Sequence, residues 1–285
     1  MIKSLCLVGG NGFIGQNIIN DYSKKFNITS LVRKDFLDNP DVNFSVYEKN
    51  GFKIIQEKNF DYIFYMLGSP ITKKNKSSDL FTYDSNFNES ILKEFLDTAK
   101  NSTAKIIFCS SGACGAKSAD DISVYAQSKI NSEKILKLFS LKNSVSVLVL
   151  RFFSLFGRYN YKQLIYDATN KILDADGQIE MINPNSKRDF LFVDHALKIA
   201  FTHLEKSNEM FEVIDIGSGS LTSVISIYEI IMKILSKPCI IKSVEEVDNF
   251  NTEPANLSYI NLLENDININ LESDISKTVE WIINE

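Results

Sequence analysis

Residues 5–15 read LCLVGGNGFIG, and this stretch decides the fold. Its first four residues are apolar and predict a buried strand, while the periodic apolar pattern over 14–25 predicts an amphipathic helix. The glycines between them allow a tight turn, close approach of a pyrophosphate, and close packing of helix on strand. The helix N-terminus also offers free N–H groups to a phosphate. An ordinary strand–helix turn is the alternative, but we expect a dinucleotide site. Its expected cofactor contacts are Gly9, Gly12, Phe13, Ile14 and Gly15.

Short apolar runs alternate with amphipathic stretches through the first half of the chain. This alternation is typical of a parallel sheet with helices on both faces, and near-continuously apolar strands fit burial on both faces. We therefore expect an α/β fold, a doubly wound Rossmann sheet. The predicted strands are 5–8, 28–32, 62–67, 105–109 and 145–150, and the predicted helices are 14–25, 88–99 and 124–139.

The alternation loosens after residue 150. The expected domains are a dinucleotide-binding Rossmann domain over 1–155 and a mainly substrate-binding α/β lobe over 156–285. Segments near 190–220 of the second range are expected to return to the Rossmann domain. The predicted strands here are 179–182 and 213–216, and the helices are 162–173, 195–204, 223–235 and one ending at Trp281.

The composition excludes several classes of protein. The 285 residues are 44% hydrophobic, with a formal net charge of −5 and a pI near 5.3. There is no basic surplus for nucleic acid and no apolar run of the ~18 residues that span a membrane. The four cysteines match no zinc spacing, and sparse cysteines in a long chain are typical of the cell interior. We expect a cytoplasmic protein that binds no metal, nucleic acid or membrane.

The end of the second predicted strand bears on the choice of cofactor. NAD sites usually carry an acid here for the ribose 2′-hydroxyl, whereas this chain has Arg33 and Lys34, whose cations suit a 2′-phosphate. Arg33 is therefore a further expected cofactor contact, and NADP(H) is favoured over NAD(H). Asp35 follows closely and keeps NAD(H) open.

Residues 125–129 read YAQSK, which places Tyr125 and Lys129 on one face of a predicted helix. A phenol is a poor acid or base at neutral pH, and a neighbouring ammonium lowers its pKa toward the useful range. Upstream, the 105–109 strand runs into Ser110 and Ser111, at the strand end where ligands bind in parallel sheets. Turn chemistry is the alternative for these serines. The glycine turn, the serines and the Tyr/Lys pair are far more specific together than apart.

These motifs resemble the extended short-chain dehydrogenase/reductase family, in its NAD(P)-dependent nucleotide-sugar epimerase/dehydratase/4-ketoreductase branch. The resemblance covers nearly the whole chain and includes the strand 61–68 and the helix from Asn88 to Ala99. It extends to RFFSLFG at 151–157, KRDFLFVDHA at 187–196 and IDIGSG at 214–219.

The resemblance implies a role for each matched position. Ser111 is the catalytic serine, with Ser110 the less favoured choice. Tyr125 is the acid/base, and Lys129 is its electrostatic partner. The implied cofactor contacts also include Leu67, Tyr125, Lys129 and Phe152.

Two positions are implied to contact a nucleotide-sugar substrate. Arg188 would hold the diphosphate, and the alternative is a surface arginine paired with Asp189. Ser154 stands where many relatives carry Asn. Two further departures are the short spacing of 14 residues from Ser111 to Tyr125 and the sequence GSP at 68–70, where small alanines are usual.

The resemblance also bears on the reaction. Dehydratases of this kind carry an Asp-Glu pair after the catalytic hydroxyl, where this chain has Gly112 and Ala113. Epimerases recycle a tightly held NAD and usually carry an acid where this chain has Arg33. We expect an NAD(P)H-dependent reductase of a 4-keto-6-deoxy nucleotide sugar, with hydride from the nicotinamide and the proton from Tyr125. The alternatives are an NAD-dependent nucleotide-sugar 4-epimerase and a non-catalytic dinucleotide-binding protein, which the presence of Tyr125 and Lys129 disfavours.

Relatives often form homodimers through the Tyr/Lys helix and the helix before it. Apolar residues of these helices would either form such a surface or pack on the sheet. They are Ile91, Leu92, Phe95, Leu96, Ile130, Ile135, Leu136 and Phe139.

Overall fold

The computed structural model divides the chain into two compact units. The first comprises Met1–Arg151 and Lys206–Ile214, and the second comprises Phe152–Glu205 and Asp215–Glu285. The structure describes residues 2–32, 42–68, 78–115, 123–161, 163–245, 253–257 and 267–285.

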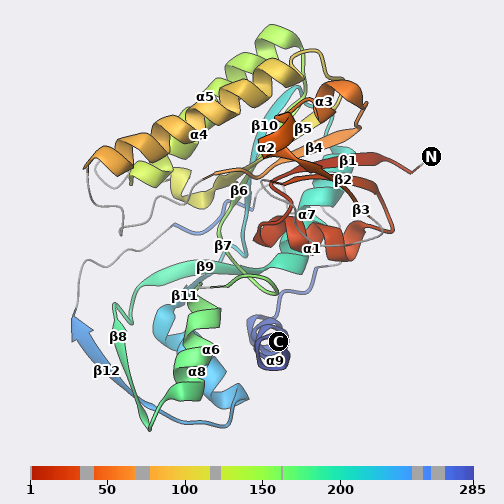
Figure 1. Ribbon diagram of the computed structural model, residues 1–285. Helices are drawn as coiled ribbons and strands as arrows, with labels where there is room; N and C mark the ends of the chain where they lie inside the picture. The colour runs from red at the N-terminus through yellow and green to blue at the C-terminus, as the bar shows by residue number, and fades with distance from the viewer. Residues whose placement is uncertain are drawn as a thin grey trace. The chain divides into compact units, whose positions relative to one another are not determined.

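A seven-stranded sheet forms the centre of the fold, in the order β10-β6-β5-β4-β1-β2-β3 (Figure 1). Neighbours from β3 through β5 pair in parallel. The winding direction reverses between β1 and β4, and parallel sheets bind ligands beyond the carboxyl ends of the strands at such a switch point. The strands are β1 Ser4–Val8, β2 Asn27–Val32, β3 Val42–Val46, β4 Tyr62–Tyr65, β5 Lys105–Ser111, β6 Val147–Phe152 and β10 Phe211–Ile216.

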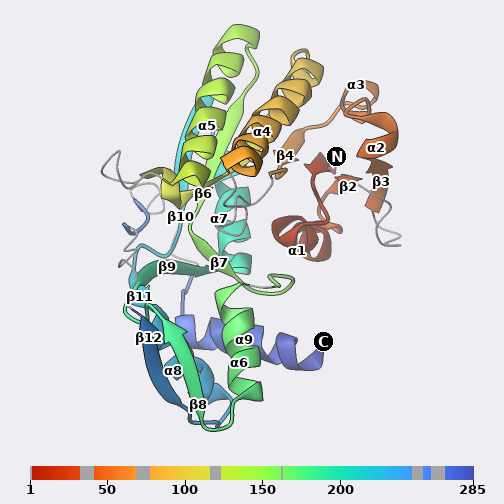
Figure 2. The same ribbon diagram turned by 60° about the vertical axis from the view of Figure 1, so that its left-hand side comes forward.

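Helices cover both faces of this sheet, which confirms the predicted doubly wound Rossmann fold. Right-handed crossovers place α1 opposite α4 and α5, because the two halves of the sheet wind in opposite directions. Figures 1 and 2 show α4 and α5 packed side by side. The helices are α1 Phe13–Tyr22, α2 Tyr47–Asn50, α3 Ile54–Glu57, α4 Ser78–Ala99 and α5 Val124–Asn143, with a 3₁₀ turn η1 at Gly112–Gly115.

The predicted strands of this half agree with the structure within two residues at each end, with two larger differences nearby. Strand β3 was not predicted, because its alternating run of five residues, VNFSV, is too short to stand out. Helix α4 begins at Ser78, ten residues before the predicted start at Asn88. The residues 78–87 are mostly polar, and the apolar periodicity that marks a helix begins only afterwards.

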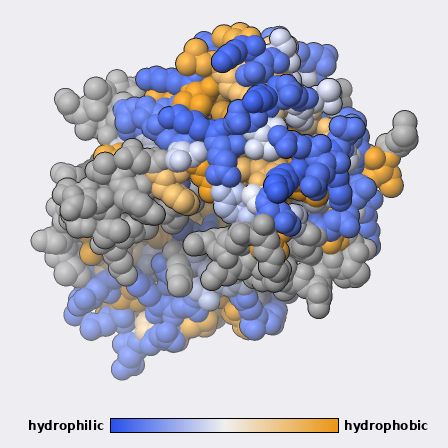
Figure 3. Space-filling view, turned by 45° about the horizontal axis from the view of Figure 1, so that its top comes forward, coloured by the Kyte–Doolittle hydropathy of each residue, from blue (hydrophilic) through white to orange (hydrophobic). Residues whose placement is uncertain are grey.

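The apolar side chains of α4 and α5 that were considered for a dimer surface pack mainly on the sheet. Leu92, Phe95, Leu96 and Leu136 are each at most 4% exposed and belong to the core. A homodimer stays a prediction, but these four side chains are not available to form its surface. Large apolar residues of α5 that do lie at the surface are Val124, Leu138 and Leu141. Figure 3 shows hydrophobic groups interspersed with hydrophilic ones on the face that it presents.

The second unit contains two small sheets, β11-β9-β7 and β12-β8, and the mutually packed helices α6, α8 and α9 (Figure 2). None of the described helices is long and apolar enough to cross a membrane. The strands are β7 Ser154–Phe156, β8 Gln178–Ile182, β9 Lys187–Phe192, β11 Leu221–Ser223 and β12 Ile240–Glu245. The helices are α6 Leu164–Asp174, α7 Val193–Lys206, α8 Val224–Ile234 and α9 Leu271–Asn284.

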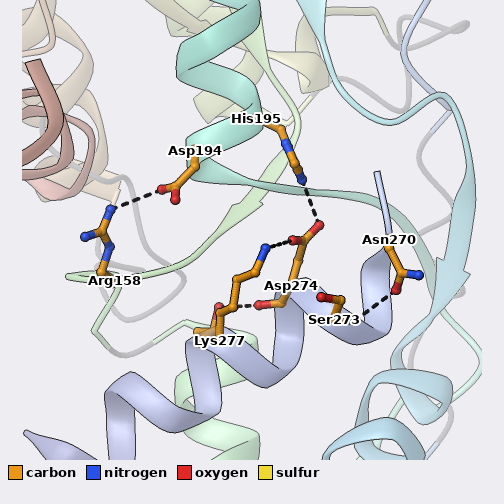
Figure 4. A network of polar contacts seen from close by, with 8 residues as sticks. Arg158, Asp194, His195, Asn270, Ser273, Asp274 and Lys277 are labelled. Carbon is orange, nitrogen blue, oxygen red and sulfur yellow. Dashed lines mark hydrogen bonds and ion pairs between the residues drawn. The ribbon is translucent and has the colours of Figure 1, made fainter. Parts of the chain in front are cut away.

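A buried carboxylate ties α9 to α7 within the second unit (Figure 4). Asp274 of α9 is 2% exposed, and its Oδ2 lies 3.0 Å from Nε2 of His195 at the start of α7. Its Oδ1 accepts a hydrogen bond of 2.9 Å from Nζ of Lys277. The α9 N-terminus is capped by Asn270, whose Oδ1 accepts from the Ser273 N–H. These contacts fix α9 at its first two turns.

Candidate active site

The glycine turn after β1 requires glycine for reasons internal to the fold. Gly9 has φ +92°, a left-handed conformation, and its N–H donates to the carbonyl of Leu31 in β2 at 2.9 Å. A Cβ at Gly10 would lie 2.1 Å from Oγ of Ser30, and one at Gly15 would lie 2.4 Å from the carbonyl oxygen of Gly10. Sequence reasoning passed over Gly10, although the Gly-Gly pair was the signal that could have identified it.

The tip of the turn is open, in contrast to its base. Gly12 is the N-cap of α1, makes no side-chain cap bond, and has no acidic residue in the following helical turn. A Cβ here would meet only the carbonyl of Gly9, at an ordinary 3.4 Å. The end of β4 is adjacent, because a Cβ at Gly9 would lie 3.0 Å from Cδ2 of Leu67. An uncapped helix N-terminus beside bare backbone fits the diphosphate of a dinucleotide.

Of two other expected cofactor contacts, Arg33 and Phe152, the structure describes only Phe152. Arg33, with Lys34 and Asp35, lies outside the described residues, which end at Val32 on this side. Phe152 is the last residue of β6 and is buried.

Tyr125 lies in the first turn of α5 and bonds through its side chain to Ser111 at the end of β5. The helix start is fixed by Ser123, whose Oγ accepts from the Ala126 N–H at 3.1 Å. Burial raises the pKa of Tyr125, and the hydrogen bond with Ser111 lowers it in part. The structure therefore brings together two of the three predicted catalytic residues.

Lys129 lies one helical turn after Tyr125 and points to the same strand end. Its Nζ donates to the carbonyl of Cys109 at 2.9 Å and lies 4.9 Å from the ring centre of Phe108. A Cβ at Gly68 would lie 3.7 Å from this Nζ, which places the ammonium near the end of β4 as well. Burial lowers the pKa of Lys129. The expectation that Lys129 lowers the pKa of Tyr125 stays a prediction.

The two serines of the strand end have different partners. Ser110 is 6% exposed and donates to Oε1 of Glu133 at 2.6 Å, whereas Ser111 is partly exposed and bonds to Tyr125. Glu133 in turn accepts from Arg151 of β6, at 3.0 Å from Nε and 2.7 Å from Nη2. This geometry favours Ser111 over Ser110. Sequence reasoning missed Glu133 and Arg151, although Glu133 stands eight residues after Tyr125, on the same helical face.

The two predicted substrate residues belong to the second unit, in neighbouring strands of the β11-β9-β7 sheet. Ser154 begins β7 and pairs with Phe190, two residues after Arg188 in β9. Arg188 is exposed, and its side chain makes no hydrogen bond or ion pair within the described part of the chain. A guanidinium in this state can receive an anion.

Asp189 does not pair with Arg188. It is buried and accepts hydrogen bonds from the backbone around it. The carboxylate is 1% exposed and accepts from the N–H groups of Ser218, Gly219 and Ala255, at 2.7 to 2.9 Å. The hydroxyl of Ser218 also donates to it. The alternative of a surface Arg188–Asp189 pair is therefore wrong.

The first unit thus combines an open glycine turn with a Ser–Tyr contact and a nearby ammonium at a switch point. A hydroxyl pair of this kind can hold a carbonyl or alcohol oxygen, and the phenol can exchange a proton with it. No described acid follows Ser111 directly, because η1 places Gly112 and Ala113 there.

Comparison with known proteins identifies the family of this chain. The model of the NAD dependent epimerase/dehydratase family matches residues 5–217. The uncharacterized UDP-glucose epimerase YtcB of Bacillus subtilis (strain 168) is 22% identical over 291 residues, covering 88% of this chain and 87% of the relative. The GDP-6-deoxy-D-talose 4-dehydrogenase of Aggregatibacter actinomycetemcomitans is 24% identical over 282 residues, covering 92% of each.

Solved structures share the fold over the whole chain. UDP-glucuronic acid 4-epimerase from Bacillus cereus, in complex with UDP-glucuronic acid and NAD, superposes with a TM-score of 0.83. It is 18% identical, and the match covers 99% of both chains. The chain belongs to the NAD-dependent epimerase/dehydratase family, enzymes of the extended short-chain dehydrogenase/reductase type.

Proposed function

We propose that this enzyme reduces the 4-keto group of a 4-keto-6-deoxy nucleotide sugar. The observation that carries the proposal is the side-chain bond between Ser111 and Tyr125, beside Lys129 and at the sheet end that also presents the glycine turn. The absence of an acid pair after Ser111 in the sequence disfavours dehydration.

The protein groups divide the work at the substrate carbonyl. When the substrate binds, Ser111 and Tyr125 would give up their mutual bond and both donate hydrogen bonds to the keto oxygen, which polarises it. A bound reduced nicotinamide supplies the hydride that adds to the carbonyl carbon. Tyr125 then gives its proton to the resulting alkoxide, so the ketone gains one hydride and one proton and becomes an alcohol. Lys129 stabilises the phenolate that remains until solvent returns a proton.

The rest of the substrate and the cofactor fit the same proposal. The diphosphate of a nucleotide sugar would be held by Arg188, whose guanidinium has no protein partner among the described residues, with Ser154 on the adjacent strand. The turn at residues 9–15 would hold the cofactor diphosphate. NADP(H) is proposed over NAD(H) from the sequence alone, through Arg33.

The test is turnover of a defined panel of substrates. UDP-, dTDP- and GDP-linked 4-keto-6-deoxyhexoses are incubated with NADPH or NADH, and loss of the reduced-nicotinamide absorbance is followed. We expect one sugar to support multiple turnovers, faster with NADPH. Gly12→Ala should weaken NADPH binding by about tenfold or more without loss of melting temperature, because its Cβ meets no close protein atom. Absence of turnover with every sugar contradicts the reductase proposal.

A second candidate is an NAD-dependent nucleotide-sugar 4-epimerase, favoured by the names of the relatives above. This activity would use the same residues in both directions, with Tyr125 first accepting and then returning the proton. It predicts cofactor retained through purification and conversion of UDP-glucose to its 4-epimer without net consumption of NADPH. Product analysis by NMR separates the two activities directly.

A further inference from the structure

The helix face that carries Tyr125 and Lys129 continues one turn further to Glu133. Residues at positions i, i+4 and i+8 share a face of an α-helix. Each of these three side chains bonds to a different member of residues 109–111 at the end of β5. Three successive turns of α5 are therefore tied to three consecutive strand residues.

Glu133 is held from a third element as well. It is 7% exposed, and both of its oxygens accept from the guanidinium of Arg151 on β6. A bidentate pair of this kind has little rotational freedom. The carboxylate thus fixes Ser110 of β5 between α5 and β6, one residue before the serine that bonds to Tyr125.

The charge of Glu133 also acts on Lys129. Burial lowers the pKa of Lys129, and the Glu133 carboxylate is among the groups that oppose that shift. A phenol benefits from this lysine only while the lysine is an ammonium. Glu133 therefore supports both the position and the charge state of the predicted catalytic groups.

We infer that Glu133 is a positioning residue: through Ser110 it holds the end of β5 against α5, so that Ser111 stays within hydrogen-bond distance of Tyr125. This inference rests on the proposed function, since it assumes that Ser111 and Tyr125 act on the substrate. Glu133 itself bonds to neither of them and acts only through its neighbours.

Glu133→Gln tests the inference, because it keeps the size and a hydrogen-bonding group but removes the charge. We expect kcat to fall about tenfold or more, since small misplacements of reacting groups cost much rate. KM and the Kd for NADPH, measured by fluorescence titration, should change less than about twofold, because Glu133 contacts neither ligand. The alkaline limb of the kcat profile should move to lower pH, because Lys129 loses a negative neighbour.

Two further variants keep the test decisive. Ser110→Ala removes the tie between the strand end and Glu133, together with the 3.6 Å contact of the Ser110 hydroxyl with the Cys114 thiol. It leaves the pair of Glu133 with Arg151, so a smaller loss of kcat is expected. Asp274→Asn makes the same carboxylate-to-amide change in a buried, ion-paired acid of the second unit, and its kcat profile should match the wild type. If Glu133→Gln does not fold, Ser110→Ala decides.

The outcomes separate this inference from the proposed function. Wild-type kcat and pH profile in Glu133→Gln, or in Ser110→Ala where that variant decides, overturn the positioning role. An equal shift of the pH profile in Asp274→Asn overturns it too, since the effect would then be general. If Tyr125→Phe, assayed alongside, keeps full activity, the proposed function fails instead.

Discussion

The two units each contain a buried carboxylate that joins elements of its own unit, and the two clusters differ in what surrounds them. Glu133 bonds to Ser110 and Arg151, and its helix face carries Tyr125 and Lys129. Asp274 joins α9 to α7 through His195 and also pairs with Lys277 of its own helix, and the sequence predicts none of these three residues to be functional (Figure 4). Burial of an ion pair alone therefore does not indicate a role in function. The residues around the pair, such as Tyr125 and Lys129 beside Glu133, are what suggest one.

The largest loss in the free energy of unfolding is expected from truncating Glu133. Glu133→Ala leaves the Arg151 guanidinium and the Ser110 hydroxyl without their shared acceptor. Removing one partner of a buried pair costs about 3–5 kcal/mol. Urea unfolding of the wild type and the variant measures this difference. A loss below about 1 kcal/mol would show that the cluster is not a structural tie of the first unit.

A smaller loss in the free energy of unfolding is expected from truncating Asp274. Asp274→Ala removes hydrogen bonds to charged or chargeable partners, which contribute about 1.5–3 kcal/mol. The value should fall below that of Glu133→Ala because the Lys277 side chain is 56% exposed and recovers water. Turnover per folded molecule should stay at the wild-type level. A loss of kcat comparable to that of Glu133→Gln would erase the distinction between the clusters.

The smallest effect is expected in the pH dependence of stability, which should differ between variants of Lys129 and of Lys277. Burial lowers the folded-state pKa of Lys129 below its ordinary value of 10.5, so the unfolded chain binds the proton more tightly. Stability from this group therefore rises as pH increases between the lowered pKa and 10.5. Lys129→Met removes that gain. Its melting temperature relative to the wild type should accordingly be higher at pH 7 than near pH 10.

Lys277→Met is the matched control for this measurement. The Lys277 side chain is 56% exposed and pairs directly with Asp274, so its removal should lower the melting temperature at neutral pH. A rise in stability of the Lys277 variant, or a pH-independent difference for Lys129→Met, would contradict the assignment of burial as the dominant influence on Lys129.

The fold was predictable from sequence because its signals are local. In the strand, glycine turn and helix at residues 4–22, a continuous apolar run gives way to a helical apolar periodicity, with glycines between them. The structure reproduces these elements closely. Strand β3 and the start of α4 were not predictable in this way, because VNFSV is short and residues 78–87 are largely polar. Tertiary packing decides such segments.

The site was only partly predictable for a related reason. Tyr125 and Lys129 carry a recognisable spacing, and the structure places Ser111 beside Tyr125. Glu133 and Asp189 look like ordinary charged residues in the sequence, and only their partners far along the chain reveal them as buried. Glu133 is buried against Arg151, 18 residues later, and Asp189 accepts a hydrogen bond from the backbone N–H of Ala255.

The most direct test of the central claim is the turnover of Tyr125→Phe with the keto-sugar that the wild type reduces. The variant keeps the ring but loses the hydroxyl that bonds to Ser111 and donates the proton. We predict a fall in kcat of about 10²–10⁴-fold, with a far smaller change in the Kd for NADPH, because general acid catalysis is lost and the glycine turn is intact. Wild-type turnover in this variant would contradict the account.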